Sequence, residues 1–360
     1  IDFDDENAKS RDFRDPLMTL STQTDRIDRA GAPVARDRPL VGIVIGDPCG
    51  IGPEVVAKAW AGGLLHARCR PVLIGSAAAM RAALAQARLG LAVRPIDAPE
   101  EASGRVDTLE IIDTGALDPA AITPGADNAA CGKASAVWLD EADAFARAGR
   151  LDATVMAPIS SVAMKAAGVL DRVVQPVPGR SYLLLVSGAL RIAHLTDHVP
   201  LNEVPTLVTA GLVESALHTV DAALRRWGIE RPRIGVAGLN PHAAGREEDE
   251  QIAPGIARAR AAGVDASGPV SPDTLFRQCL ERRHDVVLAM YHDQGHIAIK
   301  TAAFAGNVAI VVGPPYPQLT VAHGTAYDIV GRDIADPTMI RNAILTAGSL
   351  AAGRSFPELH

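Results

Sequence analysis

The sequence predicts an α/β protein with largely parallel sheets. Short apolar runs of strand length recur along the chain, and alanine-rich segments of helical length lie between them. The apolar runs predict strands at residues 40–46, 71–75, 108–113, 153–158, 233–238, 285–290 and 308–313. The alanine-rich segments predict helices at residues 53–65, 77–90, 133–149, 213–228 and 249–263.

Length and composition set the domain organisation that we expect. The chain has 360 residues, of which 48% are hydrophobic, enough for two domains with separate cores. Residues 1–37 are charged and lack apolar periodicity, so we expect a flexible tail that is partly foreign to the native protein if Met18 is the native start. We expect one α/β domain from residues 38–128 plus 297–352, and a second from residues 129–296.

Charge and cysteine content exclude several classes of protein. A net charge of −7 argues against nucleic-acid binding, although a local cluster can still bind an anionic substrate. The chain has no run of about 20 apolar residues and no leader pattern, which argues against membrane insertion or export. Its four scattered cysteines form no CxxC pair, which predicts reduced thiols in a cytoplasmic protein.

Two glycine-containing motifs have the composition of turns that could bind a ligand. GDPCGIGPEVV, residues 46–56, leads from the first strand into a helix, and such a glycine-rich turn can bring backbone N–H groups close to an anion. Its spacing is not GxGxxG, so it is as compatible with a structural turn as with a binding loop. AHGTAYDIVGRDIADP, residues 322–337, is a second turn, and its periodicity does not separate a binding role from an ordinary loop.

Three histidines lie just beyond predicted strands. His198, His242 and His292 each follow an apolar run, and the carboxyl ends of parallel strands are where ligand crevices form. Three histidines with an open fourth position make a normal catalytic zinc or transition-metal site. The alternative is that each is a hydrogen-bonded loop residue. The spacing of His292 and His296 suits a helical pair, but we expect Gly295 between them to interrupt any helix.

Five separated stretches resemble the PdxA family, the 4-hydroxythreonine-4-phosphate dehydrogenases and their relatives. They are GDPCGIGPE (46–54), GLNPHA (238–243), GPVSPDTLF (268–276), AMYHDQGHIAIK (289–300) and AHGTAYDIVGR (322–332). The first and last also resemble isocitrate and isopropylmalate dehydrogenases. The resemblance implies a two-domain α/β/α fold of that type, a homodimer, and an active site in the interdomain cleft at the subunit interface. It places NAD on the first domain, and dimerisation and the metal on the second.

The resemblance also implies roles for individual residues. By this similarity the metal ligands are His198, His242 and His292, one of them reaching the site from the partner subunit. Lys300 contacts substrate, and Asp273 and Asp293 lie near the metal as candidate proton acceptors. The resemblance also implies a turn that receives the adenosine half of NAD, formed by His323, Gly324, Thr325 and Ala326.

The implied chemistry is oxidation of a secondary alcohol in a small hydroxy acid, with β-decarboxylation. The cofactor is NAD, with NADP as the alternative, and the cation is divalent, with zinc preferred to magnesium, manganese or cobalt. No nucleic-acid or membrane partner is expected.

The substrate is left open because the chain departs from the family's phosphate-binding pattern. The family's GHTE stretch is absent, and the nearest segment is PGRSY, in which Arg180 and Ser181 are the candidate substrate contacts. Gln318 stands where the family has an arginine, and this removes a bidentate phosphate contact. Ala309 and Ser161 replace a further asparagine and lysine.

Several readings therefore remain. The nominal substrate is 4-hydroxythreonine-4-phosphate. Alternatives are 4-phosphothreonate, 4-phosphoerythronate, or an unphosphorylated cis-dihydrodiol carboxylate such as terephthalate dihydrodiol. The alternative from a different functional class is a non-catalytic binding protein with the same fold. The retained histidines and Lys300 argue against it.

Overall fold

The computed structural model describes residues 37–173, 176–302 and 307–358, which form an α/β structure around one twelve-stranded sheet. The strands follow the order β3-β4-β2-β1-β5-β12-β11-β6-β7-β10-β8-β9 across the sheet. Their bounds are β1 Leu40–Val44, β2 Arg70–Ile74, β3 Ala92–Pro95, β4 Thr108–Ile112, β5 Ala153–Met156, β6 Tyr182–Ser187, β7 Leu190–His194, β8 Ile234–Ala237, β9 Ala266–Val270, β10 Val286–Ala289, β11 Val308–Val312 and β12 Gln318–Val321. The predicted tail, residues 1–37, lies outside the described residues except for Asp37.

The sheet contains two groups of parallel strands. β3, β4, β2, β1, β5 and β12 pair in parallel, and so do β7, β10, β8 and β9. Between the groups, the pairs β12–β11, β11–β6 and β6–β7 are antiparallel and reverse the strand direction. The predicted α/β class with mostly parallel strands is confirmed. The sheet is continuous past residue 129, since β5 pairs with β1 and β12, and the two-domain boundaries stay a prediction.

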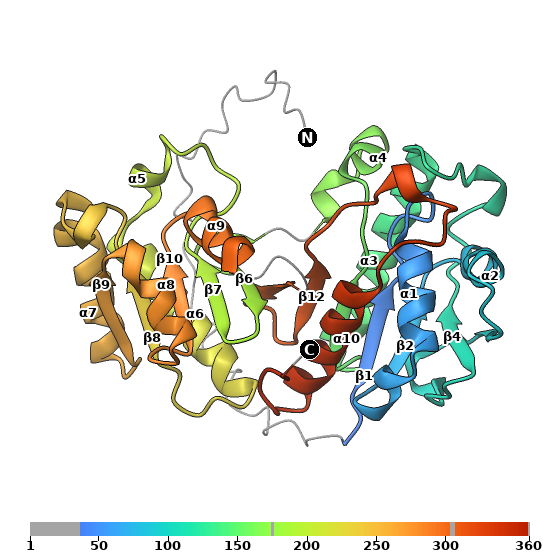
Figure 1. Ribbon diagram of the computed structural model, residues 1–360, viewed down its shortest axis with the longest axis horizontal. Helices are drawn as coiled ribbons and strands as arrows, with labels where there is room; N and C mark the ends of the chain where they lie inside the picture. Colours follow the sequence, from blue (N-terminus) through green and yellow to red (C-terminus); the bar gives the residue numbers. More distant parts are fainter. Residues whose placement is uncertain (1–36, 174–175, 303–306, 359–360) are drawn as a thin grey trace, which may run out of the picture. The chain divides into compact units, whose positions relative to one another are not determined.

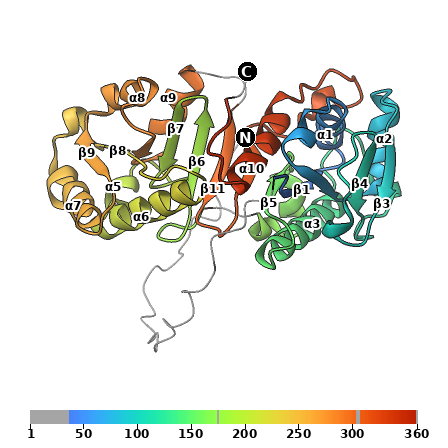
Figure 2. The same ribbon diagram turned by 90° about the horizontal axis from the view of Figure 1, so that it is seen from below.

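Helices cover the sheet (Figure 1). Their bounds are α1 Gly52–Ala61, α2 Ala77–Gln86, α3 Ala129–Arg147, α4 Ser161–Ala166, α5 Val204–Leu207, α6 Ala210–Arg226, α7 Ala253–Ala261, α8 Pro272–Leu280, α9 His292–Ala302 and α10 Thr338–Ala351. α3 and α10 both contact β1 and β5, and Figure 2 shows them on opposite faces of these strands. β1 is therefore buried on both sides, as its continuous apolar run predicts. Among the described residues, no helix is long and apolar enough to cross a membrane.

Helix α9 corrects the expectation that Gly295 interrupts a helix. The helix runs from His292 to Ala302 without a break. A Cβ atom at Gly295 would lie 2.3 Å from Nε2 of His194, on the neighbouring strand β7. Close packing of α9 against β7 therefore explains the glycine. Its lower helix propensity destabilises the helix by about 1 kcal/mol relative to alanine.

A buried carboxylate joins β3 and β4. Glu110 of β4 is fully buried and accepts hydrogen bonds from Arg94 of β3, from the Ser103 N–H and hydroxyl, and from the Gly104 N–H. Burial raises the pKa of Glu110, but these hydrogen bonds outweigh it, and the pKa lies below its usual value. Glu110 is thus ionised at neutral pH and holds the loop before β4 in place.

Candidate metal and substrate site

The predicted metal-binding histidines lie after neighbouring parallel strands. β7 pairs with β10 with His194 opposite Ala289, and β10 pairs with β8. His198 follows β7, His292 begins α9 after β10, and His242 follows β8. Parallel strands present their carboxyl ends at one edge of a sheet, so this topology directs the three segments toward the same edge.

His198 and His292 come together with Asp197. Their rings lie 4.8 Å apart between centroids, and one ligand atom from each of the three residues lies within 4.8 Å of the others. Nδ1 of His292 lies 2.7 Å from Oδ1 of Asp293, and Nδ1 of His198 lies 3.2 Å from Oδ1 of Asp197. A carboxylate beside Nδ1 favours a proton there and leaves Nε2 with its lone pair. Both rings thus have the arrangement of metal-ligating histidines, and this pair fits a divalent metal.

Two further histidines extend this cluster. The ring of His296 stacks on that of His292 at 3.6 Å, and the buried ring of His194 lies 4.9 Å from His296. Nδ1 of His194 donates to the Leu183 carbonyl at 3.1 Å, and Nδ1 of His296 donates to the His292 carbonyl at 3.1 Å. Burial, then the neighbouring histidines, lower the pKa of His194 to about 3 and of His296 to about 4. Both rings are therefore neutral at pH 7.

His242 is not part of this group in the described chain. It lies in the short 3-10 turn Pro241–Ala243, is exposed, and has a positive φ of 60°. Together with Asp273 it lines a pocket between this turn and the start of α8, which Tyr291 and Gln294 also line. Asp273 is exposed and accepts a hydrogen bond from the Ser271 hydroxyl at 2.6 Å. Two of the three predicted ligands are therefore adjacent, and the third faces a neighbouring pocket.

Lys300 and Asp293 share a second pocket with the histidines. This pocket is lined by His292, Asp293, His296, Ile297, Lys300 and Thr301, all on α9. Hydrogen bonding to His292 lowers the pKa of Asp293, which is therefore an anion at neutral pH. Lys300 is exposed two helical turns after His292, so its ammonium group can meet an anionic ligand held beside the histidines.

The predicted substrate contacts differ in their positions. Arg180 is exposed, and Ser181 accepts a hydrogen bond from the Val177 N–H at 2.8 Å. Both precede β6, whose Leu183 pairs with His194, so they lie near the end of β7 that leads to His198. Gln318 instead begins β12 and lines a mainly apolar pocket formed by β5, β12 and α3, away from the pockets of the histidines.

The predicted cofactor turn packs against the glycine-rich loop. The Ile51 N–H donates to the Thr325 carbonyl at 3.0 Å, and a Cβ atom at Gly50 would lie 2.8 Å from Cβ of Thr325. His323 contacts the Gly324 carbonyl at 2.9 Å, and Ala326 has a φ of 46°. A pocket lined by Pro48, Gly50, Pro53 and Val330 lies beside the start of α1. Within the described residues, no hydrogen bond, ion pair or ring contact joins this turn to the histidine cluster.

Comparison with known proteins identifies the family. Residues 67–347 match the sequence profile described as pyridoxal phosphate biosynthetic protein PdxA, which spans more than half of the chain. The chain belongs to the PdxA family. A PdxA relative from Novosphingobium aromaticivorans, named "Putative 4-hydroxythreonine-4-phosphate dehydrogenase", is 52% identical over 323 residues, covering 90% of this chain and 98% of its own.

Solved structures confirm the PdxA fold. The 4-hydroxythreonine-4-phosphate dehydrogenase of Klebsiella pneumoniae has a TM-score of 0.79 at 35% identity and is covered over 99% of its length, with 87% of this chain. A terephthalate 1,2-cis-dihydrodiol dehydrogenase from Burkholderia xenovorans has a TM-score of 0.64 at 32% identity, covering 87% of this chain and 98% of its own. The predicted family and its α/β dehydrogenase fold are thus confirmed.

Sequence reasoning did not include His194, His296 and Asp197 in the cluster. The one signal in the sequence was a spacing of four residues, between His194 and His198 and between His292 and His296. In the first pair, His194 is the last residue of β7 and His198 lies in the loop after it, whereas the second pair lies on helix α9. Spacing alone does not show that the two pairs face each other across β7 and β10.

Proposed function

We propose that this PdxA-family protein is a metal- and NAD-dependent oxidoreductase that oxidises a secondary alcohol of a small hydroxy acid. Where a carboxylate lies β to the new ketone, carbon dioxide leaves. The observation that carries the proposal is the pairing of His198 with His292, each with Nδ1 against a carboxylate, beside a pocket that contains Lys300. A non-catalytic binding role gives no reason for this combination of ligands and cation.

The metal would be held by Nε2 of His198 and of His292, with His242 completing the set from the partner subunit of a homodimer. The exposed position of His242 outside the cluster is compatible with this assignment. A divalent cation, zinc in preference to magnesium, manganese or cobalt, lowers the pKa of a bound hydroxyl group and stabilises the charge that develops on it. A shared site would make the dimer necessary for activity.

The chain's own residues bind and orient the substrate. Lys300 supplies positive charge for a carboxylate or phosphate in the pocket of α9. Asp293 fixes the tautomer of His292, and its lowered pKa makes it a better orienting anion than a base. Asp273 accepts a hydrogen bond from the Ser271 hydroxyl and lines the same pocket as His242, so we favour Asp273 as the proton acceptor.

NAD would bind at the turn formed by residues 323–326, and NADP is the alternative cofactor. Support comes from the packing of this turn on the loop at residues 46–52 and from the pocket at the start of α1. Backbone N–H groups at the start of a helix favour a pyrophosphate group. These cofactor and substrate proposals fit a small-molecule enzyme of the cytoplasm.

A phosphorylated four-carbon hydroxy acid is our first substrate candidate, nominally 4-hydroxythreonine-4-phosphate, with 4-phosphothreonate or 4-phosphoerythronate as variants. Arg180 is the side chain that favours it, as an exposed cation before β6. The unphosphorylated dihydrodiol carboxylate is the second candidate. The observation in its favour is that the Ser181 hydroxyl accepts from its own turn and Gln318 faces another pocket.

Formation of NADH or NADPH by the metal-loaded enzyme, supplied with NAD or NADP, tests the proposal. The four compounds to compare are 4-hydroxythreonine-4-phosphate, 4-phosphothreonate, 4-phosphoerythronate and terephthalate dihydrodiol, each with and without a chelator. We expect turnover of one of them that chelator abolishes and that is lost in His198→Ala and His292→Ala. The matched control is His218→Ala, which removes a histidine on α6 that is outside the cluster. No turnover with any compound and either cofactor, or turnover unaffected by chelator, contradicts the proposal.

A further inference from the structure

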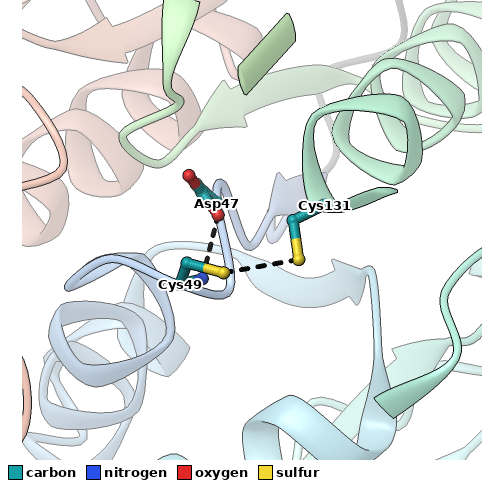
Figure 3. A group of neighbouring side chains, drawn as sticks. All are labelled: Asp47, Cys49 and Cys131. Carbon is teal, nitrogen blue, oxygen red and sulfur yellow. Dashed lines mark hydrogen bonds between the residues drawn. The ribbon is translucent and has the colours of Figure 1, made fainter. Parts of the chain in front are cut away.

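A second group of side chains of the types that bind metals lies next to β1, beside the parallel strands β3, β4, β2, β1, β5 and β12. Asp47 and Cys49 belong to the loop between β1 and α1, and Cys131 lies in the first turn of α3 (Figure 3). All three side chains are buried, and one ligand atom from each lies within 4.8 Å of the others. The sulfur atoms of Cys49 and Cys131 are 3.4 Å apart, although 82 residues separate them in the sequence.

The hydrogen-bond donors that meet the buried Asp47 carboxylate are neutral groups. Asp47 accepts hydrogen bonds from the Cys49 N–H at 2.9 Å and from the Tyr327 hydroxyl at 2.6 Å. The same hydroxyl lies 2.9 Å from Oδ1 of Asp127, which is exposed and also accepts a hydrogen bond from the Ser160 hydroxyl. Asp47 is buried, and across the described segments of the chain it forms no ion pair with lysine or arginine. A buried carboxylate without a cationic partner is costly unless a proton or a cation neutralises it.

We propose that Sγ of Cys49, Sγ of Cys131 and a carboxylate oxygen of Asp47 bind a thiophilic divalent cation, zinc in the first place. Tetrahedral zinc with bonds of about 2.3 Å places two sulfur ligands roughly 3.8 Å apart, close to the separation found here. The Thr123 N–H already donates to Sγ of Cys49 at 3.3 Å and would stabilise a thiolate there. The fourth position is left for water.

Binding would release the two thiol protons to solvent. Burial raises the pKa of both cysteines, so without metal they are neutral thiols at pH 7. Two thiolates and one carboxylate then balance the dipositive ion to within one charge. Affinity therefore increases with pH, as for other thiolate metal sites.

The position of the site indicates a structural role. It connects α3 to the loop at residues 46–52, and that loop is hydrogen-bonded to the 323–327 segment through Ile51 N–H to Thr325 O and Tyr327 OH to Asp47. A cation there would fix three segments that are distant in sequence. This site is separate from the histidine cluster, and the inference does not depend on the proposed enzyme activity.

Cobalt(II) titration of the protein after chelator treatment and metal removal tests the site, because thiolate-to-cobalt charge transfer absorbs in the near ultraviolet and histidine or oxygen ligation does not produce this band. We expect the band with the wild-type protein and with His292→Ala. It should disappear in Cys49→Ser and in Cys131→Ser. Cys279→Ser is the matched control, since Cys279 is buried elsewhere, and the band should persist there.

Absence of the band in wild-type protein overturns the inference, and so does a band that survives either serine substitution at Cys49 or Cys131. A thiol count on denatured, unreduced protein provides a second measurement that needs no variant. Four free thiols are expected from the four cysteines. Two would mean that Cys49 and Cys131 form a disulfide, which also overturns it.

Discussion

Replacing Gly295 by alanine should destabilise the protein although the position is helical. The new methyl group would lie 2.3 Å from Nε2 of His194 and 2.7 Å from Cγ2 of Ile192, below any normal contact. Overpacking of this kind costs about 1–3 kcal/mol. The His194 ring is buried and tied to the Leu183 carbonyl, so it yields little and the upper part of this range applies. After subtracting the helix propensity of alanine, about 1 kcal/mol, we expect a loss of about 2 kcal/mol.

The measurement is the free energy of unfolding from urea titration of the wild-type protein and each variant. Gly211→Ala is the matched control, since Gly211 lies in helix α6 with nothing within 4 Å of the added methyl group, and it should stabilise by up to about 1 kcal/mol. In a His194→Ala background, Gly295→Ala should lose the part of its cost that comes from the His194 ring, while the contact with Ile192 remains. The packing argument is refuted if Gly295→Ala is as stable as the wild type while the control behaves as expected.

Three further predictions concern stability and substrate binding. Glu110→Gln should lower the free energy of unfolding at pH 7 by about 1–3 kcal/mol. The pKa of Glu110 is lower in the folded protein than its unfolded value near 4.5. The stabilisation by Glu110 is therefore present above pH 4.5 and is lost as the pH falls through the folded pKa. Urea titration across this pH range measures the loss, and Glu230→Gln, at an exposed glutamate, is the control. A similar loss of unfolding free energy in Glu230→Gln would contradict the argument. Asn128→Ala should cost about 0.5–2 kcal/mol, because Asn128 accepts the first N–H groups of α3, and an unchanged unfolding midpoint would be the contrary result. Arg180→Ala should raise KM for a phosphorylated substrate at least about tenfold with a small effect on kcat; an equal rise in Arg81→Ala would show a general charge effect.

The strands with continuous apolar runs were predictable from sequence because burial on both faces requires them. All seven predicted runs overlap a strand of the sheet, from β1 to β11. Five strands lie outside these runs. β6 and β7 form the apolar stretch before His198, on either side of Gly188, and were not predicted as separate strands. β3, β9 and β12 were missed because they are short and contain arginine, proline, glycine or glutamine, and their positions depend on neighbours already in place. The helix α9 was misjudged because Gly295 is set by tertiary packing, which local propensity does not reveal.

The candidate site was predictable in its residue types and less so in its grouping. His198 and His292 meet because β7 and β10 are adjacent, and strand order is a property of the whole sheet. The separate position of His242 likewise could not be deduced from spacing. The same limit applies to Cys49 and Cys131, which no short-range pattern connects.

The antiparallel strands in the middle of the sheet also bear on how this chain is synthesised. β5 and β11 are joined only through β12, which lies more than 160 residues after β5 (Thr154 pairs with Gln318). A nascent chain therefore exposes one edge of β5 until Gln318–Val321 has been translated, and an exposed edge strand is a template for wrong pairing. Non-local pairing of this kind slows folding, since loop closure precedes any gain from contact. The translation of Gln318–Val321 thus limits when a stable sheet can form, and chaperone dependence should be concentrated in the interval of synthesis between β5 and this segment.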